Sequence, residues 1–247
     1  MLKLMKSSLH NMYNNPPLVL AVIPAKKVSR RLTGKNLKRL CGHPLIAWTI
    51  DAAKKSKKIT HLVVSSDCSK TCKVAKKYGA MVPFLRPSYL TGTNVTNYPV
   101  VMHTLKFMEK KFKIKYDIIL LLQPTCPVRS TKHIDNSIND LNSSKLNTVV
   151  SVKGPYVKRD PILKKIDGEI LKPLCSYSTE KKSKGFYLYN ASIYGAKRDY
   201  FFREQKLTSK KEVPIIMNKF YSIDVDDKSD LIIAENYLKY LKKVIKK

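Results

Sequence analysis

Four aspartates fall within positions 224–230, although the 247-residue chain has only 18 acidic residues in all. We expect residues 221–225 to form a β-strand, so that Asp224 and Asp226 point to one side, about 7 Å apart. One or two carboxylates plus substrate phosphate oxygens are the usual ligands of Mg²⁺. Capping of the last helix by Asp227 would explain one of these aspartates but not two. The cluster therefore predicts that Asp224 and Asp226 bind Mg²⁺.

A basic loop, residues 25–36, follows the first apolar segment and reads A-K-K-V-S-R-R-L-T-G-K-N. Ligands of open α/β sheets bind at the carboxyl ends of the strands, where this loop would lie. Its five cations would neutralise phosphates, and Gly34 would allow the backbone to approach them closely. The spacing matches neither of the common glycine-rich phosphate motifs. A nucleotide triphosphate is the predicted ligand, and a solvated basic loop is the alternative.

A third candidate is the segment Q-P-T-C-P-V-R, residues 123–129, which follows the most apolar run of the chain. Its two prolines indicate a rigid loop at the end of a central strand, where a ligand would lie. Taken alone, this pattern is also compatible with an ordinary connecting loop.

Short apolar segments alternate with amphipathic helical patterns, which is typical of a mostly parallel sheet with helices on both faces. The expected strands are residues 18–24, 61–65, 80–84, 116–122, 148–152, 191–196 and 221–225. The expected helices are residues 45–54, 69–78, 98–110, 132–141 and 229–244. The alternation is interrupted at residues 153–187, which we interpret as an insertion. The fold class predicted is α/β.

Residues 1–17 are expected to be a flexible tail, and residues 18–247 a single domain. The apolar run at residues 18–25 is too short for a signal peptide and continues directly into the basic loop. No stretch approaches the roughly 18 apolar residues that a membrane span requires. Five cysteines without a CxxC pair indicate free thiols in a reducing compartment.

The net charge of +30 first suggests a polyanionic partner such as nucleic acid. However, the basic residues are scattered in pairs along the whole chain, and no basic stripe interleaved with aromatic residues emerges. Only eight of the 48 basic residues are Arg, as an AT-rich coding sequence would produce. We therefore expect no nucleic-acid or membrane partner.

Eight motifs in order resemble those of the acylneuraminate cytidylyltransferases, the CMP-sialic acid synthetase family. They cover roughly residues 19–238 and read I-P-A, G-K-N, H-P-L-I-A-W-T-I, V-V-S-S-D, A-K-K-Y-G-A, V-P-F-L-R-P, L-L-Q-P-T-C-P-V-R and S-I-D-V-D-D. G-K-N and L-L-Q-P-T-x-P-x-R make the chain more similar to the sialic and legionaminic acid branch than to the KDO enzymes.

The resemblance implies a Rossmann-like nucleotide-diphospho-sugar transferase fold with a small dimerisation insertion at residues 153–187. It also implies that CTP and a nonulosonic acid react to give a CMP-sugar and pyrophosphate, with Mg²⁺ as cofactor. A homodimer in the cytoplasm, or in the nucleus of a eukaryote, is the expected assembly.

The resemblance further assigns a ligand to individual residues of this sequence. Nucleotide contacts are expected from Lys26, Ser29, Arg30, Lys35, Asn36, Asp67, Arg86 and Asn97. Sugar contacts are expected from Gln123, Asn190 and Lys164, and metal contacts from Asp224 and Asp226. Lys26, Arg30, Lys35 and Asp224 are the expected catalytic residues.

The sequence departs from the family pattern at several of these places. Lys26 replaces an Arg, Lys27-Val28 replaces two glycines, and Arg31 and Ala191 each replace one more. The segment T-N-V-T-N at residues 93–97 replaces the family's D-T-x-S-S. A related enzyme for pseudaminic acid or KDO, and an inactive relative that binds polyanions, are therefore the alternatives.

Overall fold

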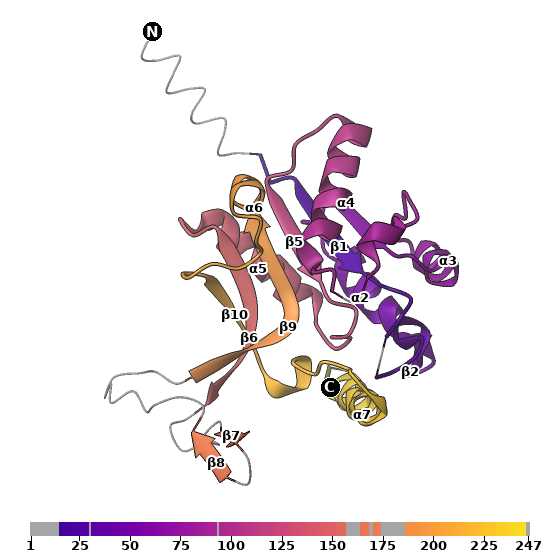
Figure 1. The fold of residues 1–247 in the computed structure, drawn as a ribbon, viewed down its shortest axis with the longest axis vertical. Coiled ribbons are helices and arrows are strands. Elements are labelled where there is room, and N and C mark those ends of the chain that lie inside the picture. The colour runs from indigo at the N-terminus through magenta and orange to yellow at the C-terminus, as the bar shows by residue number, and fades with distance from the viewer. Residues whose placement is uncertain are drawn as a thin grey trace.

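The computed structural model describes residues 15–29, 31–92, 94–156, 164–167, 170–173 and 186–245. Residues 156, 164–167, 170–173 and 245 are described by their backbone. A mostly parallel sheet with helices on both faces forms the centre of the molecule (Figure 1).

The central sheet has six strands in the order β10-β6-β9-β5-β1-β4. These strands are β1 (Val19–Pro24), β4 (His61–Ser65), β5 (Ile118–Leu122), β6 (Thr148–Tyr156), β9 (Phe186–Lys197) and β10 (Val213–Met217). β1 is parallel to β4 and β5, and β10 is parallel to β6. β9 runs antiparallel between β5 and β6. The predicted, mostly parallel sheet is confirmed, and its central strand β5 is buried along its whole length, as parallel strands usually are.

Helices cover both faces because successive residues of a strand point to opposite sides. The helices are α2 (Leu45–Lys54), α3 (Ser69–Lys77), α4 (Asn97–Phe112), α5 (Thr131–Ser143), α6 (Arg198–Glu204) and α7 (Lys228–Ile245). Ala21 and Ile23 of β1 pack in one core with residues of α2, α3 and α5. Leu20 and Val22 pack in the other with residues of α4 and α6.

A third apolar cluster joins the loop after β1 to the last helix of the chain, α7. Leu32, from the loop after β1, packs with Val225 and with Ala234 and Leu238 of α7. The remaining elements are short. They are the 3-10 helices η1 (Lys35–Leu37), η2 (Ser88–Leu90) and η3 (Lys219–Tyr221), and the strands β2 (Arg39–Leu40), β3 (His43–Pro44), β7 (Lys164–Asp167) and β8 (Ile170–Pro173).

Two strand predictions were wrong. The segment 221–225 is not a strand, because η3 ends at Tyr221 and irregular backbone follows. The strand in this part of the chain is instead β10, at one edge of the sheet, which the sequence did not predict. In the segment 80–84 only Met81 forms a bridge, to Val63, and a proline at position 83 cannot donate a ladder hydrogen bond.

Some expectations concern residues that the structure describes only in part. Residues 1–14 of the predicted tail lie outside the described residues, as does much of the predicted insertion at 153–187. Within the described ranges, no helix combines the length and the apolar composition that crossing a membrane would need.

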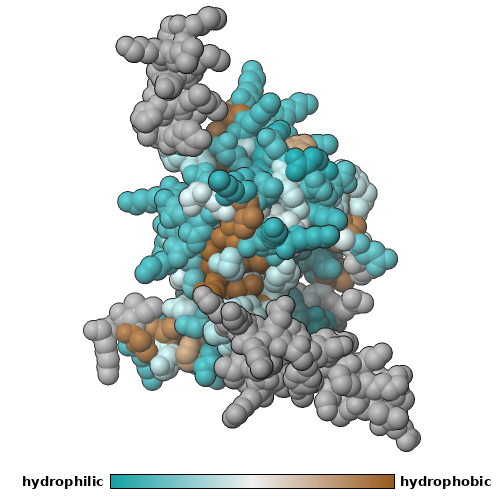
Figure 2. All heavy atoms as spheres, turned by 90° about the vertical axis from the view of Figure 1, so that its left-hand side faces the viewer, coloured by the Kyte–Doolittle hydropathy of each residue, from teal (hydrophilic) through white to brown (hydrophobic). Residues whose placement is uncertain are grey.

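Large hydrophobic side chains are exposed at several places on the surface. They include the four consecutive residues 186–189 of β9, each 41–53% exposed, and Ile216 of β10, which is 53% exposed. β10 lies on the left in Figure 1. Figure 2 faces that side and shows hydrophobic atoms in the middle of a mostly hydrophilic surface. Such a patch is typical of a protein interaction surface.

Candidate functional site

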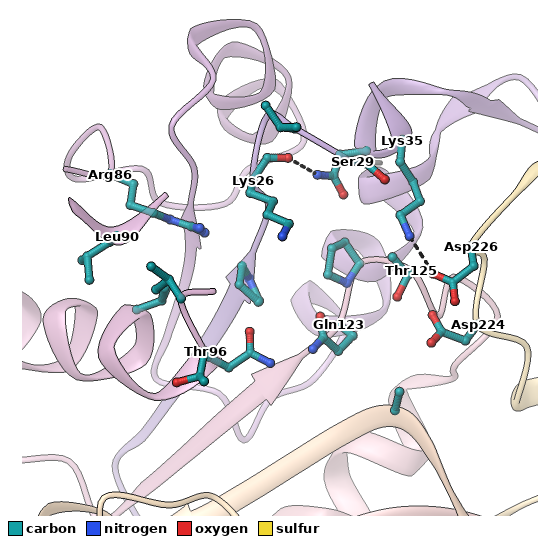
Figure 3. A pocket seen from close by; sticks show the side chains of 18 of the residues that line it. Lys26, Ser29, Lys35, Arg86, Leu90, Thr96, Gln123, Thr125, Asp224 and Asp226 are labelled. Atoms are coloured by element: carbon teal, nitrogen blue, oxygen red, sulfur yellow. Dashed lines mark hydrogen bonds and ion pairs between the residues drawn. The ribbon is translucent and has the colours of Figure 1, made fainter. Parts of the chain in front are cut away.

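A cavity of about 330 Å³ opens at the carboxyl ends of β1 and β5 (Figure 3). A volume of this size suits a small-molecule ligand. The structure brings nine of the predicted site residues together in its wall. They are Lys26, Ser29, Lys35, Asn36, Arg86, Asn97, Gln123, Asp224 and Asp226. Their convergence follows from the fold, since parallel strands direct their carboxyl ends to one edge of the sheet.

The basic loop of residues 25–36, which we call the cation loop, is held by two side chains. Asp67, at the carboxyl end of β4, accepts a hydrogen bond of 2.7 Å from the backbone N–H of Lys27. Asn36 donates from Nδ2 to the carbonyl of Lys26 at 3.1 Å. Asp67 does not line the cavity. It therefore shapes the loop from behind, whereas Lys26 faces the cavity (Figure 3).

The segment of residues 222–227, which we call the acid loop, is tied to its surroundings through its backbone. The N–H of Val225 donates to the carbonyl of Thr125 at 2.8 Å. The Oδ2 atom of Asp230 accepts from the N–H groups of Asp226 at 2.8 Å and Asp227 at 3.2 Å. These bonds place Asp224 and Asp226 on the cavity wall without a β-strand.

The carboxylate of Asp227 caps α7, and we therefore do not assign it to a metal. Its Oδ1 accepts from the N–H of Ser229 at 2.8 Å and of Asp230 at 3.1 Å, as an N-cap carboxylate does. The hydrogen bonds from Ser229, followed by that from Asp230, lower the pKa of Asp227. Capping thus accounts for Asp227 and leaves Asp224 and Asp226 for a ligand.

Asp226 lies between two cations of the other loop. Its Oδ2 is 2.6 Å from Nη2 of Arg31, and its Oδ1 is 3.1 Å from Nζ of Lys35. Lys35 also donates to the carbonyl of Val225 at 2.8 Å. The cation loop and the acid loop therefore meet at the Asp226 carboxylate and at the neighbouring Val225 carbonyl.

The carboxylate pair fits a magnesium ion that arrives with a phosphate ligand. Asp224 and Asp226 lie side by side at the cavity wall (Figure 3). No group of three or more His, Cys, Asp or Glu side chains suited to a metal occurs in the described part of the chain. Mg²⁺ is commonly held by one or two carboxylates while phosphates and waters complete its octahedron. The donor set is thus sufficient for Mg²⁺ bound together with a nucleotide.

Two buried side chains beside the cavity have polar atoms without a hydrogen-bond partner among the described residues. One is Oδ1 of Asn36, and the others are Nε and Nη1 of Arg129. Nη2 of Arg129 donates to the carbonyls of Gln123 and Cys126. Burial lowers the pKa of Arg129 to about 10, so it stays charged at neutral pH. Arg129 thus fixes the loop after β5, while Asn36 offers a free acceptor.

Cys126, in the same loop, is not suited to nucleophilic chemistry. Its thiol is fully buried, and burial raises its pKa to about 12, helped by the charge of Asp224. The thiol form is not the reactive one. The chemistry of the cavity therefore depends on cations, carboxylates and amides.

The opposite wall carries a buried arginine and small polar groups. Arg86 is 6% exposed and donates from Nε to Oγ of Ser65 at 3.1 Å and from Nη2 to the carbonyl of Ser65. Burial lowers its pKa. Thr96 and Asn97, at the beginning of α4, lie on the same wall. This wall therefore offers a guanidinium and small polar side chains to a ligand.

The structure does not bring all predicted residues to the cavity. Asn190 is buried, accepting from Oγ of Ser151 at 2.6 Å and donating to Oγ of Ser222 at 3.0 Å. Its neighbour Ala191 lines the cavity instead, with a φ of 59°. This left-handed conformation is uncommon for a residue with a Cβ atom, and the family glycine would adopt it freely. Arg30 and the side chain of Lys164 lie outside the described residues.

Sequence reasoning assigned no role to several residues that line the cavity, among them Thr96 and Thr125, and did not predict the contact that Arg31 makes. Arg31 was one of the five loop cations, but its contact with Asp226 joins residues 195 positions apart and leaves no local signal. Thr125 was in the quoted Q-P-T motif, which was a sufficient signal to include it.

Comparison with known proteins gives consistent results. A sequence model of the cytidylyltransferase family matches residues 20–244. The CMP-N,N'-diacetyllegionaminic acid synthase of Legionella pneumophila is 35% identical over 231 residues, which cover 89% of this chain and 96% of that protein. The N-acylneuraminate cytidylyltransferase of Escherichia coli is 28% identical over 228 residues, 87% of this chain and 51% of that protein.

Solved structures share the fold at low sequence identity. CMP:2-keto-3-deoxy-manno-octonic acid synthetase complexed with CTP superposes with a TM-score of 0.65 at 14% identity, over 90% of this chain and 99% of that one. A 4-diphosphocytidyl-2C-methyl-D-erythritol synthase superposes with a TM-score of 0.67 at 11% identity, over the same shares. The predicted nucleotidyltransferase-type α/β fold is confirmed.

Proposed function

The chain belongs to the cytidylyltransferase family, and from that premise we propose that it activates a nonulosonic, sialic-acid-type sugar with CTP. The products are the CMP-sugar and pyrophosphate. One observation carries this proposal. Cations from the loop after β1 and two carboxylates from the acid loop line one cavity at the carboxyl edge of the sheet. That arrangement suits a nucleoside triphosphate that arrives with a divalent cation.

The cation loop neutralises the triphosphate in this proposal. Lys26 and Lys35 both line the cavity, and Lys35 is only 13% exposed. Fixed positive charges in a partly enclosed site stabilise the charge that develops on the departing pyrophosphate. The anomeric hydroxyl oxygen of the sugar attacks the α-phosphorus and loses its proton. The bond from that phosphorus to the bridging oxygen of pyrophosphate breaks.

Asp224 and Asp226 would hold Mg²⁺ in this scheme. When bound, the ion would act as a Lewis acid and offset negative charge on the triphosphate. The protein's own contribution is to fix the two carboxylates before the substrate arrives. The hydrogen bonds of Asp230 and Thr125 to the acid loop support that role.

The base and the sugar acid would bind at different parts of the cavity wall. The base would lie against the Arg86 wall, and the sugar acid near Gln123 and Ala191. We favour a legionaminic-type acid, because relatives that include the Legionella protein bear that name. A pseudaminic acid enzyme matches over only 44% of this chain.

We also propose a homodimer, formed through the exposed hydrophobic residues 186–189 of β9 and Ile216. Their exposure supports an interface, because large apolar side chains gathered on one side are usually covered by a partner. Lys164 would then contact the sugar acid of the partner's site. A reaction that consumes CTP is expected in the cytoplasm.

Pyrophosphate release tests the proposal. Purified protein with CTP and Mg²⁺ is assayed against N-acetylneuraminic, legionaminic, pseudaminic and KDO acids, with UTP and ATP as nucleotide controls. We expect turnover with CTP and the highest kcat/KM with a legionaminic-type acid. Turnover with KDO alone would reassign the sugar. No turnover, together with steeply salt-dependent DNA binding, would favour the polyanion-binding alternative.

A further inference from the structure

Arg31 and Asp226 are held close by the packing of their neighbours. Leu32, next to Arg31, is 4% exposed, and Val225, next to Asp226, is fully buried. Both belong to the third apolar cluster, which also contains Ala234 and Leu238 of α7. The contact between Arg31 and Asp226 is therefore built into the fold, although the arginine itself is on the surface.

The two cations on Asp226 differ in how firmly they are held. The side chain of Lys35 is 13% exposed, and its Nζ is fixed by a second hydrogen bond, to the carbonyl of Val225. The side chain of Arg31 is 69% exposed, and Asp226 is its hydrogen-bond or ion-pair partner among the described residues. Arg31 lines the cavity as well. Of the two cations, Arg31 is the one that is free to exchange partners.

We propose that Arg31 is an additional triphosphate-binding residue that exchanges Asp226 for phosphate when the metal and the nucleotide bind. In the structure its guanidinium contacts Oδ2 of Asp226, an oxygen that a metal would need. When the metal takes the carboxylate, the guanidinium is released at the cavity wall. A guanidinium fork matches phosphate oxygens better than any other side chain. This inference rests on the proposed function.

The exchange has two consequences of opposite sign. Removal of Arg31 takes away a competitor for Asp226, so the metal should bind the empty protein more tightly. The same removal takes away a phosphate contact, so CTP should bind more weakly. A residue that only supported the loop would weaken both.

Metal binding to the protein without nucleotide is the first measurement, with Mn²⁺ as the probe and electron paramagnetic resonance of free Mn²⁺ as the readout. We expect Arg31→Ala to lower the Kd of Mn²⁺ about threefold, the size typical of one exposed ion pair. Arg203→Ala is the matched control, because Arg203 is 66% exposed and pairs at 2.8 Å with Glu204 on α6. That control should leave the Kd unchanged.

Nucleotide binding is the second measurement. We expect Arg31→Ala to raise the KM for CTP about fivefold with little change in kcat, and Arg31→Lys to recover part of that loss. An unchanged Kd for Mn²⁺ in Arg31→Ala would overturn the exchange. So would an unchanged KM for CTP.

Asp226→Asn separates failure of the exchange from failure of the proposed function. If wild-type protein binds Mn²⁺ and Asp226→Asn does not, the metal site stands, and an unaltered Arg31→Ala then refutes the exchange alone. If wild-type protein binds Mn²⁺ neither alone nor together with CTP, the metal assignment fails and the exchange fails with it.

Discussion

The two loops that meet at Asp226 are held in different ways. The acid loop is fixed by backbone hydrogen bonds to Thr125 and Asp230, and two of its six residues, Ser222 and Val225, are buried. In the cation loop, Lys26, Lys27, Val28 and Arg31 are exposed. The Asp67 carboxylate accepts a hydrogen bond from the backbone of this loop, at Lys27.

This difference suggests that the two loops have separate roles in the reaction. A loop whose backbone bonds are satisfied by the protein can present its carboxylates in one geometry before the ligand arrives. The cation loop is held through its backbone at Lys26 and Lys27, but its exposed like charges repel one another until an anion is present. Changes in the acid loop should therefore affect turnover, and changes in the cation loop should affect mainly nucleotide binding.

The largest effect is expected from Asp226→Ala, because it removes a metal ligand from the fixed loop. We expect kcat/KM to fall at least about 1,000-fold, or about 4 kcal/mol of transition-state stabilisation. The melting temperature should stay close to that of the wild type, because the Asp226 carboxylate is partly exposed and its backbone bonds remain. Pyrophosphate release and thermal melting check this. Retained Mg²⁺-dependent turnover would remove the metal assignment.

Lys35→Met should have the next largest effect, because Lys35 of the cation loop contacts the acid loop at two points, the Val225 carbonyl and the Asp226 carboxylate. We expect kcat/KM to fall about 100-fold, comparable to the loss of one preorganised donor in an electrostatic site. Lys38→Met, a nearby exposed lysine outside the cavity, is the control. Equal losses in both variants would show that the bulk positive charge of this region matters rather than the position of Lys35.

Asp230→Ala tests whether the backbone support of the acid loop matters for catalysis. Asp230 does not line the cavity, yet it holds the N–H groups of Asp226 and Asp227. We expect kcat to fall about tenfold and stability to fall by about 1–3 kcal/mol, the usual effect of removing the acceptor of such hydrogen bonds. Asp199→Ala, in the first turn of α6, is the matched control. A loss of stability without a loss of kcat would contradict the proposed support.

The cap of α7 gives a smaller effect that depends on pH. The pKa of Asp227 is lowered in the folded protein, so its contribution to stability is present above the unfolded value of about 3.9 and is lost as pH falls through the folded value. Asp227→Asn keeps the cap but cannot titrate. We expect wild type to melt higher at neutral pH and the two curves to converge below about pH 4. A constant difference across that range would rule out the charge of Asp227 as its source.

Much of the fold followed from local patterns. The helices at 45–54 and 69–78 and the strand at 61–65 lie where periodicity places them, to within one residue. The site residues near strand ends, such as Lys26 and Gln123, also line one cavity. In these regions the local pattern and the tertiary structure agree, because each element is buried on the face that the pattern marks.

Other features depend on contacts that no local pattern records. β10 is a short edge strand with alternating burial, and the proline within it argues against a strand, whereas 221–225 looked more strand-like and became a loop. The amide of Asn190 matched a family motif, but its partners Ser151 and Ser222 come from other segments and bury it. The pairing of Arg31 with Asp226 likewise needs the folded chain.

The smallest effect is expected at Lys26, where this chain has a point charge in place of the family's arginine. Lys26 lies in the cation loop and faces the cavity, and its carbonyl is held by Asn36 (Figure 3). Lys26→Arg keeps the charge and adds a planar fork that can bind two phosphate oxygens at once. If the cation loop is ordered mainly by its ligand, that fork should lower the KM for CTP about threefold and leave kcat nearly unchanged. An equal or lower KM for CTP with the natural lysine would mean that the neighbouring Lys27 and Val28 have reshaped the loop around the shorter head group, and that the cation loop is more fixed than its exposure indicates.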